Sequence, residues 1–184
     1  MSVKGTVVNS IQQYVKTKHK EDFNTWLDTL SPASREIFSN PINVSDLFDV
    51  KIGLIEPSEK VAALFFENRF DGAWQLGRYS AEVSLTGVYK AFVLIATPAF
   101  IMSRAGRIMK TLYTDTEFVV VDKSSNSVVT EARNLPEDHI VLEQRIGGWM
   151  EKALEITGCS NIDIKIPIRS SRKNEVTRYE ITWD

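Results

Sequence analysis

The chain has 184 residues, a length typical of one domain whose hydrophobic core needs neither disulfides nor a structural metal. Hydrophobic residues make up 43% of it and charged residues 25%, which excludes disordered and fibrous proteins. A formal net charge of -2 leaves no excess of lysine and arginine for phosphates, so we expect no nucleic-acid partner. A single cysteine and a polar N-terminal sequence indicate a cytoplasmic protein. The longest apolar run, 91–102, is too short to span a bilayer.

Helices are predicted over much of the first 56 residues. Apolar residues at helical spacing predict helices over 6–18 and 21–30. The pair Ser31-Pro32 is typical of a helix start, and Asn40-Pro41 ends this third helix. Hydrophobic residues then alternate between 48 and 54, which predicts a strand there.

Three further helices are expected before the sheet. Pro57 opens a helix that runs to about residue 70, and Asp71-Gly72 is expected to break it. A long apolar helix follows over 73–96, and its apolar residues surround so much of its circumference that we expect neighbours on several sides. The pair Thr97-Pro98 begins another helix that ends near Leu112.

The C-terminal part has the pattern of two hairpins separated by a helix. Segments 118–121 and 128–132 are rich in β-branched residues and flank a polar turn. A helix begins at Leu135-Pro136 and ends at Gly158. Alternating apolar residues over 162–168 and 179–183 predict the second hairpin. We therefore predict one α+β domain over 1–184, in which an N-terminal helical layer, about 1–113, packs on an antiparallel four-stranded sheet within about 114–184.

Few residues of this sequence are suited to catalysis or metal binding. His19 and His139 lie far apart and have no metal-ligand spacing with cysteine or carboxylate residues. Cys159 follows the helix-ending glycine and has no histidine in a known nucleophile arrangement, so we interpret it as a core residue. We expect no enzyme activity and no metal. The pair Gly147-Gly148 inside a helix predicts close approach of another backbone, or alternatively room for a ligand beside Trp149.

Aromatic and methionine side chains suggest an apolar pocket between the helices and the sheet. An arginine, Arg104 or Arg107, could anchor an anionic group of a ligand there. The alternative is that these residues are ordinary core. The candidate ligand-binding residues are Tyr79, Phe92, Met102, Met109, Tyr113, Trp149, Met150 and Arg104.

Short motifs along the chain resemble known families. Residues 3–8, followed by an amphipathic helix and Trp26-Leu27, resemble the opening of haem NO-binding (H-NOX) domains. Segments 76–81, 87–92 and 105–113, Pro98 and the helix with residues 147–150 resemble an uncharacterised family abundant in myxobacteria. Those proteins are similar in turn to 4-vinyl reductase domains and to subunits of the TRAPP trafficking complex. The resemblance implies an α+β fold whose interior holds haem or an acyl or aromatic group.

The sequence departs from these families at the residues that would carry cofactors. H-NOX domains use a ligating histidine and a Tyr-x-Ser-x-Arg motif, and residues 102–133 contain neither. The cysteine of the 4-vinyl reductase hairpin is also absent between 169 and 180. We therefore expect no haem and no other cofactor. The resemblance implies a sensory or signalling domain that binds a small hydrophobic ligand, and the alternative is a homodimerising interaction module.

Overall fold

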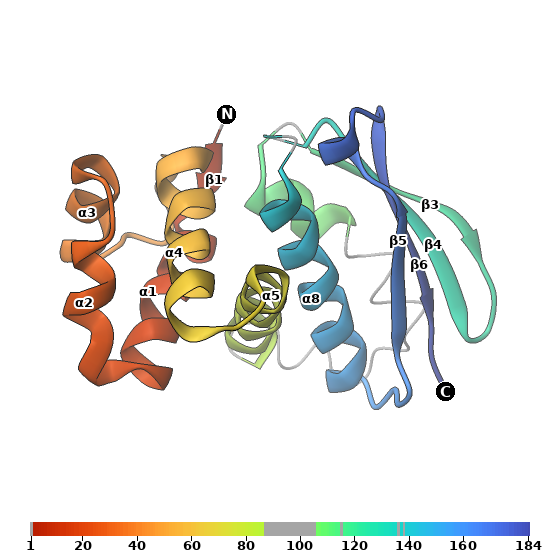
Figure 1. The fold of residues 1–184 in the computed structure, drawn as a ribbon. Helices are drawn as coiled ribbons and strands as arrows, with labels where there is room; N and C mark the ends of the chain where they lie inside the picture. Colours follow the sequence, from red (N-terminus) through yellow and green to blue (C-terminus); the bar gives the residue numbers. More distant parts are fainter. Residues whose placement is uncertain (1, 87–105, 115, 136, 138) are drawn as a thin grey trace.

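The computed structural model describes residues 2–86, 106–114, 116–135, 137 and 139–184 (Figure 1). The N-terminal elements are β1 (Ser2–Lys4), α1 (Gly5–Lys18), η1 (Lys20–Asp22), α2 (Phe23–Asp28), α3 (Pro32–Ser39), β2 (Leu47–Asp49), η2 (Lys51–Ile55), α4 (Glu56–Phe65) and α5 (Arg69–Thr86). After residues 106–112, which are helical, come β3 (Glu117–Lys123), β4 (Ser127–Arg133), α8 (Ile140–Ile156), β5 (Asp163–Ile168), η3 (Ser170–Arg172) and β6 (Val176–Thr182).

The N-terminal half forms a helical layer, as predicted. Helix α1 covers the predicted 6–18 and buries Val7, Val8 and Ile11. The helix predicted over 21–30 is present as the 3₁₀ turn η1 followed by α2. Ser31 caps α3, because its Oγ accepts a hydrogen bond from the backbone N–H of Ser34 at 3.4 Å. Strands β1 and β2 also pair antiparallel, a small sheet that the sequence pattern did not predict.

The strand predicted over 48–54 is wrong for its second half. Strand β2 ends at Asp49, and after Val50 the five residues Lys51–Ile55 form the π-helix η2. The Asp49 carboxylate accepts a hydrogen bond from the backbone N–H of Lys51 at 2.9 Å, which turns the chain into this helix. Alternation of apolar residues was therefore misleading, because η2 still buries Leu54 and Ile55 against its neighbours.

The predicted helix break at Asp71-Gly72 is also wrong. The interruption lies earlier, since α4 ends at Phe65 and α5 begins at Arg69, with Asn68 Oδ1 accepting from the N–H of Phe70 at 2.9 Å. Gly72 lies inside α5, where a Cβ would come within 2.6 Å of the Ala62 Cβ. This glycine therefore permits close contact between α4 and α5. The predicted continuation of the helix beyond residue 86, and the start predicted at Thr97-Pro98, lie outside the described residues.

The sheet matches the prediction. Its four strands are antiparallel in the order β3-β4-β6-β5, so the strands of each hairpin are neighbours and β4 pairs with β6 in the middle. Helix α8 separates the hairpins in sequence and lies between α5 and the sheet in space (Figure 1). It begins at Ile140, five residues after the predicted start, and it ends before Gly158, which has a positive φ of 91°.

Helices α5 and α8 pack with their backbones in contact. A Cβ on Gly77 would lie 2.0 Å from the carbonyl oxygen of Arg145, and one on Gly148 would lie 2.1 Å from that of Trp74. This confirms the predicted packing role of Gly148, whereas Gly147 faces the Trp74 ring. At the same interface, Arg78 forms ion pairs with Glu151 and Glu155 of α8. Within the described ranges, no helix is long and apolar enough to cross a membrane.

A buried carboxylate ties α8 to the second hairpin. Glu143 is fully buried and forms an ion pair with Arg169 at 3.0 Å. It also accepts hydrogen bonds from the hydroxyl groups of Ser171 and Thr177 at 2.8 and 3.0 Å. Because each carboxylate oxygen has a strong donor, the charge is accommodated in the interior.

Candidate functional site

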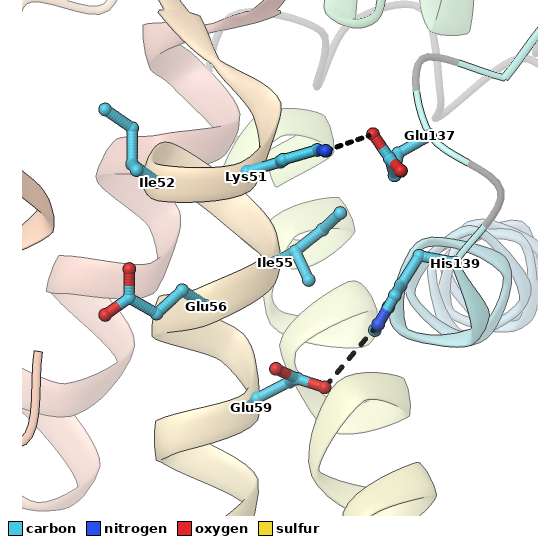
Figure 2. A pocket seen from close by; sticks show the side chains of 7 residues that line it. All are labelled: Lys51, Ile52, Ile55, Glu56, Glu59, Glu137 and His139. Atoms are coloured by element: carbon cyan, nitrogen blue, oxygen red, sulfur yellow. Dashed lines mark ion pairs between the residues drawn. The ribbon is translucent and has the colours of Figure 1, made fainter. Parts of the chain in front are cut away.

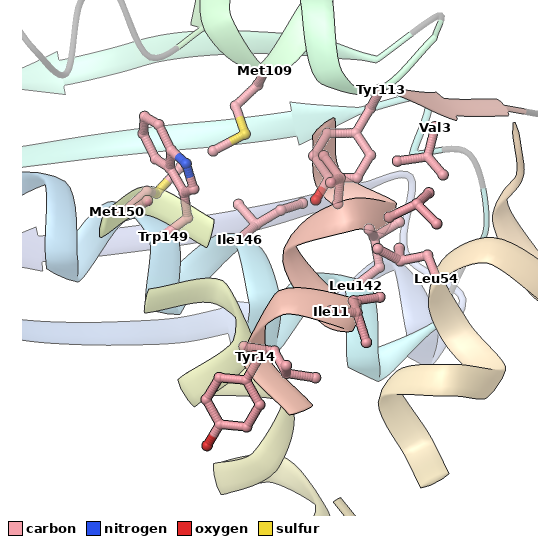
Figure 3. Close-up of a cluster of buried hydrophobic side chains, with 14 of the residues drawn as sticks. Val3, Ile11, Tyr14, Leu54, Met109, Tyr113, Leu142, Ile146, Trp149 and Met150 are labelled. Atoms are coloured by element: carbon pink, nitrogen blue, oxygen red, sulfur yellow. The ribbon is translucent and has the colours of Figure 1, made fainter. Parts of the chain in front are cut away.

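The structure brings together part of the predicted pocket set. Met109, Tyr113, Trp149 and Met150 are all buried in the core, where residues 106–113 approach α8 (Figure 3). Tyr79 lies apart from them on α5. Its ring packs edge-on against Tyr14 at 5.3 Å between ring centroids. Three predicted residues, Phe92, Met102 and Arg104, lie outside the described residues.

A buried arginine that the sequence analysis did not single out lies next to this cluster. Arg145 of α8 is 1% exposed. Its Nη1 donates to Ser58 Oγ of α4 at 3.3 Å, and its Nη2 donates to Ser10 Oγ of α1 at 3.5 Å. The hydroxyl of Tyr113 is the third polar group that interacts with the guanidinium. These three partners are neutral, and Nε has no hydrogen-bond partner among the described residues.

Burial dominates the electrostatics of this group. It lowers the pKa of Arg145, an effect that the neighbouring Tyr113 opposes. It raises the pKa of the Tyr113 phenol, although Arg145 acts in the other direction. Because arginine starts from a very high pKa, the guanidinium keeps its charge and the phenol keeps its proton at neutral pH. The interior therefore contains a cation that faces hydroxyl groups.

Trp149 lies one helical turn after Arg145 on α8, on the same face of the helix. Its indole Nε1 is buried and has no acceptor among the described residues. A buried N–H without an acceptor costs about 1–3 kcal/mol. Two neighbouring turns of α8 thus each present an unsatisfied donor to the interior. Each of these donors could be satisfied by an acceptor atom of a bound molecule.

A second candidate site is a pocket of about 290 Å³ between η2, α4 and the start of α8 (Figure 2). Two polar contacts link its walls: an ion pair of Lys51 with Glu137 at 3.5 Å, and an approach of His139 Nε2 to a carboxylate oxygen of Glu59 at 3.6 Å. His139 also caps α8, since its Nδ1 accepts from the N–H of Val141 at 3.3 Å. Its lining residues are Lys51, Ile52, Ile55, Glu56, Glu59, Glu137 and His139.

The Glu56 carboxylate of this pocket is held by the protein itself. It accepts hydrogen bonds from the Ser31 N–H at 2.6 Å and from the Ser34 hydroxyl at 2.6 Å. Burial acts to raise the pKa of Glu56, but the hydrogen bonds from Ser34 and Ser31 outweigh it and keep the pKa below its ordinary value. Since Glu56 holds α3 against α4, we interpret the pocket as a structural junction.

Comparison with known proteins places this arrangement in a known fold. No family model matches the sequence, and no curated protein matches it. Solved structures do match. The Fe(II) unliganded H-NOX protein from K. algicida has a TM-score of 0.73 at 14% identity, covering 98% of this chain and 96% of that chain. The H-NOX domain of Shewanella oneidensis in its Fe(II)CO state has a TM-score of 0.75 at 13% identity, covering 98% of both chains.

The chain has the H-NOX fold. A mutant of the T. tengcongensis H-NOX protein is similar over the same extent, with a TM-score of 0.70, 11% identity and coverage of 98% of this chain and 97% of that chain. The resemblance of residues 3–8 and 26–27 to H-NOX domains is thus confirmed at the level of fold. Identities this low show the fold and leave the ligand to be inferred from the residues of this chain.

The residues of this H-NOX fold are poorly matched to haem. The sequence has two histidines, and neither lies with the buried Met109 and Tyr113. His19 follows α1 and stacks on Phe65 with 3.8 Å between ring centroids, and His139 caps α8 at the surface pocket. Each imidazole therefore makes its contacts away from Met109 and Tyr113. The oxygen of Tyr113, of a residue type that can ligate iron, interacts with the charge of Arg145.

Cys159 does not form a nucleophile pair in this structure. Among the described residues its Sγ contacts Thr157 Oγ1 at 3.9 Å, with no histidine in reach. Burial raises the pKa of the thiol, which disfavours the reactive thiolate. The described residues also contain no group of three histidine, cysteine or carboxylate side chains placed to hold a metal.

Proposed function

We propose that this chain is a non-enzymatic binding or sensory domain for a small hydrophobic ligand, built on the H-NOX fold and working without haem. The likeness to H-NOX structures over 98% of the chain supports this proposal, because those proteins use the fold to hold a bound group. The observation that carries the proposal is the buried indole of Trp149, whose Nε1 has no acceptor among the described residues. Met109 and Met150 beside it offer adaptable apolar contact for a ligand.

Native mass spectrometry of freshly purified protein tests this proposal. We expect a fraction of the wild-type chain to carry the excess mass of a small molecule. Trp149→Phe keeps the aromatic ring but removes the N–H, so this fraction should fall roughly tenfold. Trp183→Phe is the matched control, because Trp183 is also buried but lies beyond the end of β6. A wild-type chain that carries no added mass contradicts the proposal.

A homodimerising module is the second candidate, and an exposed apolar edge favours it. Strand β3 is at the edge of the sheet, and its Val120 and Val121 are 37% and 44% exposed. An edge strand with apolar side chains is suited to pairing with another copy. Light scattering at high micromolar concentration should then give a dimer mass that Val121→Lys reduces to the monomer. A strict monomer in the wild type rejects this alternative.

A further inference from the structure

The charge of Arg145 has no counterion in the described part of the protein. No carboxylate among those residues forms an ion pair with its guanidinium. Glu143, two positions earlier on α8, is bonded to Arg169 and the second hairpin. Glu59, one position after Ser58 on α4, faces His139. An unpaired ion in a protein interior costs several kcal/mol, so the fold gains if an opposite charge joins it.

Hydrogen-bond donors also outnumber acceptors around this guanidinium. Arginine has five N–H donors, and the acceptors present are the hydroxyl oxygens of Ser10, Ser58 and Tyr113, two of them at 3.3 and 3.5 Å. Ser10 in turn donates to the Val7 carbonyl at 2.7 Å. The hydroxyls of Ser58 and Tyr113 are themselves donors, so a further acceptor could bind all three groups at once.

We propose that Arg145, Tyr113 and Ser58 bind one small monovalent anion, a halide ion or a carboxylate group, between α1, α4 and α8. The hydroxyl of Tyr113 points toward α8 in Figure 3, and the apolar side chains of Ile11, Leu54 and Leu142 belong to the same cluster. Apolar walls exclude water and strengthen the attraction between the guanidinium and the anion. A close-packed core also limits the anion to a few atoms.

This site goes beyond the proposed function. It depends on the guanidinium of Arg145, whereas the small hydrophobic ligand is assigned to the indole of Trp149. Mass spectrometry of Trp149→Phe and an anion titration of Arg145 variants are therefore independent tests, and either proposal can fail alone.

The test is a thermal unfolding titration at constant ionic strength. Protein dialysed into sodium gluconate, whose anion is too large for the site, is titrated with chloride in one arm and with formate in the other. We expect the Tm of the wild type to rise by about 5–10 °C at a hundredfold excess over Kd in at least one arm. The chloride arm identifies a halide site, and the formate arm identifies a site for a carboxylate of only a few atoms.

Two variants and a control assign the effect to this site. Arg145→Met removes the charge while keeping much of the volume, so its Tm in gluconate should equal or exceed that of the wild type and should not respond to either anion. Tyr113→Phe should weaken the apparent affinity roughly tenfold. Arg172→Met is the control, because Arg172 is exposed, and it should respond as the wild type does. A wild-type Tm that responds to neither anion overturns the proposal, as does a full response in Tyr113→Phe or Arg145→Met.

Discussion

Gly148 of α8 and Trp74 of α5 lie so close that a methyl group on Gly148 would come within 2.1 Å of the Trp74 carbonyl oxygen. The reciprocal contact is made by Gly77 of α5, where a Cβ would lie 2.0 Å from the carbonyl oxygen of Arg145 on α8. Each helix therefore supplies a glycine where the backbone of the other passes. This contact fixes the position of α8, and with it the positions of Arg145 and Trp149.

We expect Gly148→Ala to lower the free energy of unfolding by about 3 kcal/mol, because two backbones must move apart to admit the methyl group. In an unobstructed helix the same change would add about 1 kcal/mol of stability. Gly147→Ala is the matched comparison, since its Cβ would meet the outer ring atoms of Trp74, which can shift more easily. Urea unfolding measures both. Equal or higher stability of Gly148→Ala would contradict the observed packing.

Glu131 should make the stability of the sheet depend on acid pH. Hydrogen bonds from Arg178, at 2.6 and 3.1 Å, and from Arg133, at 2.9 Å, hold the pKa of Glu131 below its ordinary value. A folded-state pKa below the unfolded one stabilises the fold above about pH 4.3, and this contribution is lost as pH falls through the folded pKa. Because both arginines are partly exposed, we expect about 1 kcal/mol at pH 7.

The measurement compares wild type with Glu131→Gln in urea unfolding between pH 7 and pH 3. The variant should be less stable at pH 7, and the difference should shrink toward zero at the acid end. Glu180→Gln, at an exposed position on β6, serves as the control and should change little throughout. A difference that grows on acidification is incompatible with the assigned role of Glu131.

Haemin should not bind with defined stoichiometry. His19 is stacked on Phe65 and His139 caps α8, so neither imidazole is placed to ligate iron in the interior. Titration of the purified protein should give no sharp Soret band and no one-to-one endpoint. The opposite result, a saturable spectrum abolished by changing Met109 or Tyr113, would show that a core residue ligates haem after all.

The sequence predicted those features that depend on local patterns. The β-branched segments 118–121 and 128–132 and the alternating isoleucines before residue 169 were sufficient to predict the two hairpins. The helical stripe that contains Ile146 and Trp149 was sufficient to predict α8. Features that depend on distant contacts were missed. The sequence around Gly72 fits a helix break as well as a glycine at a contact between two helices. Only the contact with Ala62 shows that the second interpretation is right. Ile52 and Leu54 likewise fit both an alternating strand and the π-helix that the Asp49 carboxylate initiates.

The candidate site shows the same division. Met109, Tyr113, Trp149 and Met150 lie in the interior, as aromatic and methionine residues at helical spacing usually do, and their contact with a ligand stays a prediction. Arg145 was overlooked although it lies between Leu142 and Ile146 on α8. Its burial depends on Ser10 and Ser58, which are 135 and 87 positions away in the sequence. An arginine is expected at the protein surface, and the sequence around Arg145 does not show that its side chain would face the interior.

Glu143 and Arg145 make α8 a mechanical link between the two halves of the domain. The two residues are about 3 Å apart along the helix axis, and they point to different partners. Glu143 accepts hydrogen bonds at the turn between β5 and β6, whereas Arg145 donates hydrogen bonds to serines of α1 and α4. Because a helix moves as a rigid rod, a rotation of α8 that adjusts Arg145 also pulls on that turn. A change in the helical layer that moved Arg145 and rotated α8 would therefore act on the turn between β5 and β6.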